Sequence, residues 1–180
     1  NARAVIIGCN QNTLEEVDMD YAREKNISVN RRISGGGAVF HDLGNINYTV
    51  IKEQGKDDFG GYAEFTGPVI EFLGEMGVVA ELSGRNDLTV KGMKISGNAQ
   101  AAKNGRIMHH GTLLYDVSVG DLAGVLRPNQ AKISSKGIKS VRSRVTNLVE
   151  HLPEKMDAQD FLHRLYDFYL RSRPDVVERH

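Results

Sequence analysis

Residues 31 to 42 read Arg-Arg-Ile-Ser-Gly-Gly-Gly-Ala-Val-Phe-His-Asp, and the rest of the chain can be placed around this stretch. We call it the Gly loop. Three consecutive glycines leave the backbone without Cβ atoms, so it can adopt positive φ and let a ligand touch the main chain. The arginines before the glycines and the His-Asp pair after them are typical of a loop that holds an anion against peptide N–H groups. A flexible turn between solvated charges is the alternative interpretation.

The composition is that of an ordinary globular chain. It has 180 residues, of which 40% are hydrophobic and 26% charged, which is enough to bury a core. Lys+Arg and Asp+Glu both number 23, and the resulting zero net charge argues against a broad nucleic-acid-binding surface. No apolar run approaches the roughly 18 residues of a membrane span, and one cysteine cannot form an internal disulfide. We therefore predict no nucleic-acid partner, no membrane partner and a reducing, cytoplasmic setting.

Short strands and isolated helices alternate along the chain. Apolar and β-branched runs predict strands at 4–7, 27–29, 38–40, 46–51, 78–82, 87–90, 93–96 and 107–115. Capping patterns and helical spacing predict helices from Thr13 to about Lys25, with Pro68 in a first turn, from Ser118 and from Asp157. Lys91-Gly92 predicts a tight hairpin turn. This order predicts an α+β fold with a mixed, largely antiparallel sheet and packed helices, in a single domain over residues 1–180.

The second informative stretch runs from residue 84 to residue 100. Asn86 and Asp87 open a predicted strand, and a carboxylate there suits Mg²⁺ or a ribose hydroxyl. Lys94 follows the hairpin turn and precedes Ile-Ser-Gly, so its neighbours are small. A lysine in such surroundings can approach a phosphate and a carbonyl together. A solvated strand lysine is the alternative interpretation of Lys94.

The histidines and the cysteine are weaker candidates. His109 and His110 point to opposite faces of a strand, so at most one of them faces inward, and no histidine or cysteine lies at metal-ligand spacing. His41 is the better functional candidate because it adjoins the Gly loop. Cys9, in a turn after the first strand, is interpreted as structural or incidental. The Lys/Arg-rich segment 132–144 contains no aromatic residue for base stacking and suits a mobile loop over a charged small molecule.

Several motifs, taken in order, resemble the lipoate-protein ligase A family. The resemblance covers residues 4 to about 170 and rests on Arg31-Arg-Ile-Ser-Gly-Gly-Gly-Ala-Val-Phe-His-Asp-Leu-Gly-Asn45, Gly84-Arg-Asn-Asp-Leu88, Lys94-Ile-Ser-Gly-Asn-Ala99, His109-His-Gly-Thr-Leu113 and Lys136-Gly-Ile-Lys-Ser-Val-Arg-Ser-Arg-Val-Thr-Asn147. It implies a fold shared with biotin protein ligases and related to class II aminoacyl-tRNA synthetase cores. It also implies two reactions: lipoate and ATP give lipoyl-adenylate, and the lipoyl group then passes to a lysine of a lipoyl domain.

The resemblance also implies roles for individual residues. Lys94 would hold the acyl carbonyl and the phosphate of the adenylate, and Asp87, with Asn86 beside it, would bind Mg²⁺ or bridge to phosphate. His41 would line the lipoyl pocket or hydrogen-bond the intermediate, and segment 132–144 would be the adenylate-binding loop. The remaining implied contacts are Arg32 and Ser34 to substrate and nucleotide, Gly37, Ala38, Val39 and Phe40 as the main-chain nucleotide cradle, and Ala99 and His110 at the border of the site.

The resemblance further implies partners, and the chain also differs from the family in two respects. The expected acceptors are lipoyl domains of 2-oxoacid dehydrogenase E2 subunits and the glycine cleavage H protein. Relatives often carry residues before the first strand and a small accessory domain after the last helix, and we expect neither in residues 1–180. Some relatives have the accessory domain as a separate chain, which makes such a chain a candidate partner for adenylation. Cys9 occupies a turn where relatives often have arginine.

Three alternatives stay open at this point. An octanoyl or lipoyl transferase of the same fold would use a cysteine thioester and no ATP, although Cys9 is not where that nucleophile is expected. A biotin ligase is disfavoured by the Gly loop sequence. A non-catalytic lipoate-binding or acyl-carrier-binding module is a third possibility, which calorimetry with lipoate, with and without ATP and Mg²⁺, distinguishes.

Overall fold

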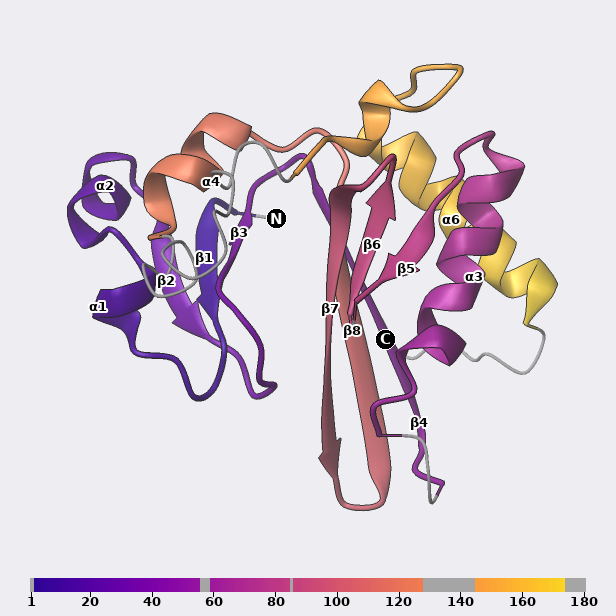
Figure 1. The fold of residues 1–180 in the computed structure, drawn as a ribbon, viewed down its shortest axis with the longest axis horizontal. Helices are drawn as coiled ribbons and strands as arrows, with labels where there is room; N and C mark the ends of the chain where they lie inside the picture. Colours follow the sequence, from indigo (N-terminus) through magenta and orange to yellow (C-terminus); the bar gives the residue numbers. More distant parts are fainter. Residues whose placement is uncertain (1, 56–58, 85, 128–144, 174–180) are drawn as a thin grey trace.

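The structure is a computed structural model that describes residues 2–55, 59–84, 86–127 and 145–173. The chain forms two sheets: the smaller lies on the left in Figure 1, and the larger lies near the centre of the molecule. In the smaller sheet, of order β2-β1-β3, β1 (Ala4–Ile7) pairs in parallel with β2 (Ser28–Arg31) and antiparallel with β3 (Val39–His41). The Gly loop connects β2 to β3. It therefore lies beside β1, on the side of the small sheet that faces the rest of the chain.

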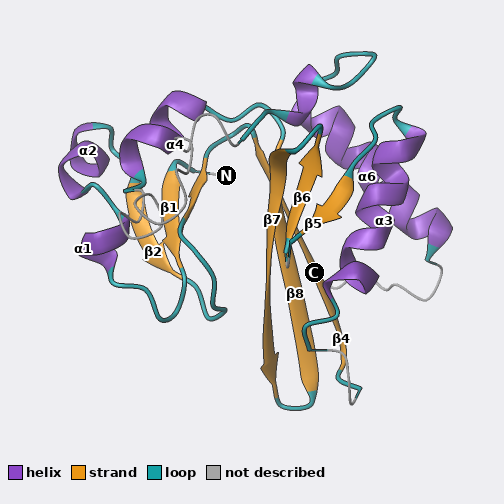
Figure 2. Ribbon diagram, viewed as in Figure 1, coloured by secondary structure: helices purple, strands orange, loops and turns teal. Residues whose placement is uncertain are grey.

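The larger sheet is antiparallel throughout. Its order is β4 (Asn45–Glu53), β8 (Arg106–Leu114), β7 (Met93–Lys103), β6 (Asp87–Val90) and β5 (Glu81–Ser83). Lys91 and Gly92, with φ of 51° and 74°, form the predicted turn between β6 and β7. The α+β prediction, with largely antiparallel strands and packed helices, is confirmed, although the strands form two sheets (Figure 2).

The predicted helix from Thr13 to Lys25 is wrong, because the structure has two short helices there. They are α1 (Thr13–Glu16) and α2 (Met19–Glu24), capped by the side chains of Asn12 and Asp18. Val17 separates them in an extended conformation and forms a β-bridge with Leu126. The Asp18 side chain can cap a new helix here, and burial of Val17 in the core beside the small sheet favours ending the first helix before it.

Two further predictions fail around helix α3 (Tyr62–Glu75). Pro68 lies inside this helix and not in its first turn, since burial of Phe65, Val69 and Phe72 outweighs the roughly 3 kcal/mol cost of an interior proline. The predicted strand at 78–82 begins only at Glu81. Val78 instead donates its N–H to Leu73 O after Gly77, a Schellman ending that explains its burial without a strand.

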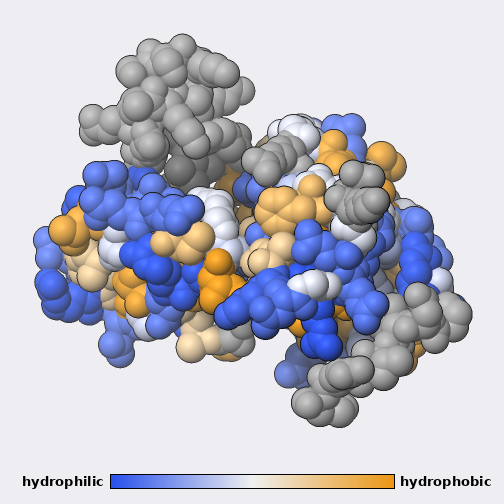
Figure 3. Space-filling model, turned by 90° about the horizontal axis from the view of Figure 1, so that it is seen from below, coloured by the Kyte–Doolittle hydropathy of each residue, from blue (hydrophilic) through white to orange (hydrophobic). Residues whose placement is uncertain are grey.

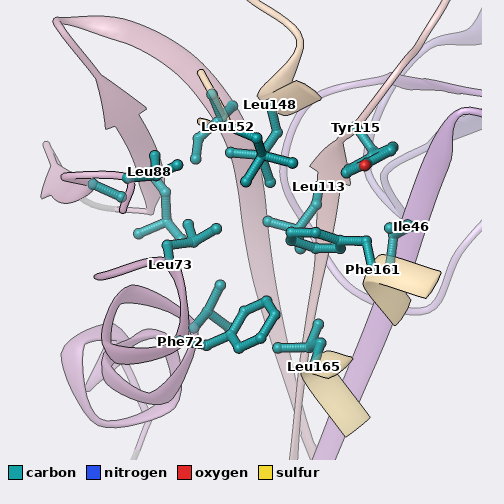
Figure 4. Packing of buried hydrophobic residues seen from close by; sticks show 14 of the residues in the cluster. Ile46, Phe72, Leu73, Leu88, Leu113, Tyr115, Leu148, Leu152, Phe161 and Leu165 are labelled. Carbon is teal, nitrogen blue, oxygen red and sulfur yellow. The ribbon is translucent and has the colours of Figure 1, made fainter. Parts of the chain in front are cut away.

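The main core fills the space between the larger sheet and helices α3 and α6 (Ala158–Ser172), with the 3₁₀ turn η2 (Leu148–Glu150) above it. Phe72 and Phe161 meet edge to face with ring centroids 5.2 Å apart (Figure 4). The closing helix begins at Asp157 as predicted, and the Asp157 side chain caps it by accepting from Gln159 N and Asp160 N. The helices thus cover one face of this sheet and leave the opposite face available for a site.

A second core lies under α2 and α4 (Val119–Val125) against the small sheet. Ser118 caps α4 as predicted, and the helix ends at Val125, whereas the expected stop, Pro128, lies outside the described residues. Seen from below, the surface is mainly hydrophilic with scattered apolar patches (Figure 3). Among the described residues, no helix has both the length and the apolar character of a membrane span.

Candidate functional site

A cleft of about 400 Å³ lies between the Gly loop and the open face of the larger sheet. Most of the predicted site residues line it, namely Arg32, Ser34, Gly37, Ala38, Val39, His41, Asn86, Lys94, Ala99 and His110. Two do not. The Phe40 side chain is 1% exposed and packs in the core beside the small sheet. Asp87 does not line the cleft itself, but it forms an ion pair with Lys94, which does.

Arg32 holds the Gly loop in shape. Its guanidinium donates to the backbone oxygens of Ile6 at 2.9 Å, Gly35 at 2.8 Å and Gly37 at 2.7 Å. Burial lowers the pKa of Arg32, and the carbonyl oxygens offset part of the desolvation of its charge. Arg32, which was expected to contact substrate, lines the cleft, and its guanidinium donors hold the Gly loop and the end of β1.

Ser34 and His110 join the two walls. The Ser34 hydroxyl lies 2.6 Å from His110 Nε2, and Ser34 is buried. Burial, and then the charge of Arg32, lowers the pKa of His110, so this imidazole is neutral near pH 7. The Ser34 side chain, expected to contact the nucleotide, is therefore engaged with the sheet.

His41 is free to bind a ligand. Its Nε2 is buried and has no hydrogen-bond partner within the described part of the chain. Burial, followed by repulsion from Arg32, lowers the pKa of His41 to about 4. A neutral imidazole nitrogen on the cleft wall can donate to or accept from a substrate, which fits the expectation for His41.

Lys94 and Asp87 form an ion pair on the opposite wall. Lys94 Nζ lies 2.7 Å from Asp87 Oδ1, with the two side chains 36% and 38% exposed. A register shift between Leu88 and Thr89 in the β6–β7 ladder brings them together. Val145 bridges to Lys94, and Thr146 N donates to Lys94 O at 3.0 Å, so the chain returns to this wall directly after residue 144. The predicted loop at 132–144 lies outside the described residues.

Asp87 is compatible with Mg²⁺ only if other ligands complete the coordination. No group of three His, Cys, Asp or Glu side chains able to hold a metal occurs in the described ranges. Mg²⁺ commonly takes one or two carboxylates and receives its remaining ligands from phosphates and water. The residues present therefore suit a Mg²⁺ that arrives with a phosphate-bearing substrate.

We expect Gly97→Ala to lower activity with little loss of stability. An added Cβ would lie 3.0 Å from Lys94 Nζ and 3.2 Å from its Cε, so it would displace the ammonium from Asp87. The lipoate-dependent ATP–pyrophosphate exchange that the sequence resemblance implies should fall by about 10-fold or more, because small misplacements of groups at a reaction centre are costly. Thermal denaturation measures stability alongside. The control is Gly67→Ala in α3, where an added Cβ meets nothing within 4 Å, and equal rates in both variants would contradict the prediction.

The sequence did not reveal a buried polar cluster at the border of the cleft. Ser96, Asn98 and Gln100 are buried at alternate positions of β7. Asn98 bonds to Ser96, and Asn98 and Gln100 both contact His109, which stacks on Phe65 with ring centroids 4.7 Å apart. The prediction that only one of the adjacent histidines faces inward is confirmed, because His109 is fully buried and His110 lines the cleft. Polar residues at every second strand position were the signal that could have predicted this cluster.

We expect stability to fall as the pH drops from 6.5 to 4. Burial lowers the pKa of His109 and of His41 to about 4, whereas the unfolded values are near 6.5. In this window the unfolded chain binds protons that the folded chain excludes, so acidification favours unfolding. Each buried histidine should lower the free energy of unfolding by about 1–2 kcal/mol between pH 7 and pH 5. Urea titrations measure this drop, which should be smaller in His109→Gln; an equal drop in that variant contradicts the assignment.

Cys9 is an unsuitable nucleophile. It is half-buried, its N–H donates to Ser34 O at 2.9 Å, and its side chain does not line the cleft. It is also the only cysteine in the chain. The thioester alternative therefore lacks a thiol at the site.

Comparison with known proteins places these features in a family. A model of the lipoyl protein ligase A/B catalytic domain matches residues 1–169. Lipoate-protein ligase LplJ of Bacillus subtilis is 52% identical over 161 residues, which are 89% of this chain and 49% of that protein. The chain thus spans about half the length of the curated relatives it matches.

Solved structures agree with this comparison. A bipartite lipoate protein ligase from Thermoplasma acidophilum, solved in a study that includes its E2 lipoyl domain, aligns with a TM-score of 0.85 at 30% identity over 100% of this chain and 71% of that one. A lipoate-protein ligase A bound with ATP aligns with a TM-score of 0.80 at 28% identity, covering 95% and 69% of the two chains. The chain belongs to the lipoyl protein ligase A/B catalytic domain family.

Proposed function

We propose that residues 1–180 form the catalytic domain of a lipoate–protein ligase. In this function ATP activates lipoate to lipoyl-adenylate, and the lipoyl group then passes to a lysine of a lipoyl domain. The observation that carries the proposal is the Lys94–Asp87 pair on one wall of a cleft whose other wall is the glycine-rich backbone of the Gly loop. Family membership and the likeness to an ATP-bound ligase support it.

The first reaction needs electrostatic stabilisation and no protein nucleophile. A lipoate carboxylate oxygen bonds to the α-phosphorus of ATP, and the bond from that phosphorus to the oxygen leading to the β-phosphate breaks, which releases pyrophosphate. Negative charge gathers on the phosphoryl oxygens, where cations and fixed N–H groups act most strongly. Lys94 supplies the cation, and the backbone of Gly37, Ala38 and Val39 supplies the surface that faces the nucleotide.

In the second reaction the acceptor amine attacks the lipoyl carbonyl carbon. A C–N bond forms, the bond from the carbonyl carbon to the phosphate oxygen breaks, AMP leaves, and the amine loses a proton. Lys94 can neutralise charge on both the carbonyl oxygen and the phosphate, because one ammonium carries three donors. The neutral His41 on the opposite wall offers a hydrogen bond to the same intermediate.

The cleft offers both apolar and charged surface. Ala38, Val39, Ala99 and Met108 contribute apolar lining, while Lys94 and Asn86 contribute polar lining. An acyl-adenylate has an aliphatic end, which suits the apolar lining, and an anionic end, which suits the polar lining. If Mg²⁺ enters with ATP, Asp87 is the residue that would hold it, and the ion would offset phosphate charge.

ATP–pyrophosphate exchange tests the proposal. The natural full-length protein is assayed with lipoate, octanoate and biotin in turn, and we expect exchange that depends on lipoate or octanoate. Acyl transfer without ATP, abolished in Cys9→Ser, would instead favour the transferase alternative. Exchange with biotin alone would also contradict the proposal.

The partners follow from the same proposal. The acceptors are lipoyl domains, such as those of 2-oxoacid dehydrogenase E2 subunits or the glycine cleavage H protein, and incubation with such a domain followed by mass spectrometry detects the added lipoyl group. An accessory domain, separate or attached, is a further candidate partner for adenylation. The cytoplasmic location stays a prediction, which cell fractionation can test.

A further inference from the structure

The buried polar cluster that borders the cleft is held together by the amide of Asn98. Asn98 Nδ2 donates to Asn86 O at 3.1 Å and to Ser96 Oγ at 3.3 Å, while Asn98 Oδ1 accepts from Tyr48 and His109. All four hydrogen-bonding positions of the amide are therefore used. Asn98 is 3% exposed, so its side chain is engaged within the protein and not with solvent.

The neighbouring groups fix the orientation of this amide. Burial raises the pKa of Tyr48, so its hydroxyl remains a donor. Gln100 Oε1 accepts from Gly60 N at 2.7 Å, which leaves Gln100 Nε2 to donate to His109 Nδ1 at 3.3 Å. His109 Nε2, 3.2 Å from Asn98 Oδ1, is then the protonated nitrogen. Each donor in this series of hydrogen bonds thus meets an acceptor. If the Asn98 amide were reversed, its NH₂ group would face the donors of Tyr48 and His109.

The other end of the amide reaches the cleft wall through Asn86. Asn98 N donates to Asn86 O at 2.9 Å, in addition to the bond from Nδ2, and Asn86 Nδ2 donates back to Asn98 O at 2.6 Å. Asn86 directly precedes Asp87, where β6 begins. Asp87 pairs in register with Gly97 and carries the carboxylate that meets Lys94. The position of Asp87 therefore depends on where Asn86 is held.

We infer that Asn98 is a positioning residue, whose Nδ2 bond to Asn86 O fixes the start of β6 and thereby holds Asp87 against Lys94. The inference rests on the proposed function and adds a residue to its site. Asn98 also borders the cleft, but its side-chain hydrogen bonds are made within the protein, and the role inferred here runs through the Asn86 backbone.

Asn98→Asp tests the inference because it keeps the shape of the side chain while replacing the donor by an acceptor, and it also adds a negative charge. The new oxygen faces Asn86 O and repels it, while the other oxygen still accepts from Tyr48 and His109. We expect kcat of lipoate-dependent ATP–pyrophosphate exchange in the full-length protein to fall by about 10-fold or more, since displacement of about 1 Å can cost about 100-fold. The KM for lipoate should change by less than about 2-fold, because the apolar lining is untouched.

Gln100→Leu is the matched control. It removes the bonds to Gly60 and His109 at the far end of the same cluster but keeps the Asn98–Asn86 bonds. We expect it to lower the melting temperature about as much as Asn98→Asp, with kcat within about 2-fold of wild type. Equal losses of kcat in the two variants would mean that the cluster serves stability alone and would overturn the inference. If Asn98→Asp does not fold, Asn98→Ala is judged by the same criteria.

Crystal structures of the two variants give a readout that does not depend on activity. In Asn98→Asp the separation of Lys94 Nζ and Asp87 Oδ1 should exceed its 2.7 Å, and in Gln100→Leu it should be retained. An unchanged pair in Asn98→Asp overturns the inference. Absence of exchange in the wild-type protein contradicts the proposed function instead, so the two failures are distinguishable.

Discussion

Lys94→Ala should abolish lipoyl-adenylate formation, with ATP–pyrophosphate exchange reduced by at least about 100-fold. Lys94 is the cation on the sheet wall of the cleft, and Asp87 holds it 2.7 Å away. Loss of one charge-stabilising donor at a transition state typically costs about 100- to 1,000-fold in rate. The variant also leaves the Asp87 carboxylate without its ion-pair partner, so an unpaired negative charge stands beside the incoming phosphates. Exchange assays and direct detection of lipoyl-adenylate measure the effect.

Lys103→Ala is the control for this prediction. Lys103 ends the same strand, β7, and is exposed at the sheet end away from the cleft lining. Exchange in this variant should stay within about 2-fold of wild type, because exposed charges contribute little. Wild-type pyrophosphate release by Lys94→Ala would refute the role given to Lys94.

Gly8→Ala should disrupt the Gly loop and remove most of the activity. A Cβ at Gly8 would lie 2.2 Å from Gly36 O and 3.2 Å from Gly36 C, so the backbone of the loop would have to move. Gly36 itself has φ of 99° and lies against Arg32, which leaves it little freedom to shift. We expect a loss of about 1–3 kcal/mol in the free energy of unfolding, together with a drop of about 10-fold or more in exchange rate, since the displaced loop is a wall of the cleft.

Gly35→Ala tests whether any replacement of glycine by alanine in the Gly loop is harmful, or only one that causes a steric clash. An added Cβ at Gly35 meets nothing within 4 Å, so stability and exchange should both remain close to wild type. Urea unfolding and exchange assays on both variants give the comparison. A stable and active Gly8→Ala protein would show that the Gly loop does not need its contact with residue 8.

Local sequence patterns predicted the elements whose signals are short-range. The Lys91-Gly92 turn, the cap at Ser118, the helix start at Asp157, and the alternation of His109 and His110 all follow from neighbouring residues. Where a tertiary contact competed, the local pattern was insufficient. Val17 leaves its helix to bridge Leu126, and Pro68 stays inside α3 because the apolar face of that helix is buried on the sheet.

The motifs of this sequence, by themselves, determined the family and most of the cleft lining, because Gly, Lys, Asp and His residues at these spacings carry a specific chemistry. Only the tertiary structure decided how those residues are used. It directed Arg32 onto the loop backbone, buried Phe40 in a core, paired Ser34 with His110, and placed Asn98 behind Asn86 and Asp87. Apart from the bond between Arg32 and Gly35, these contacts join residues distant in sequence, and packing decides which hydrogen-bond partners meet, which no local pattern records.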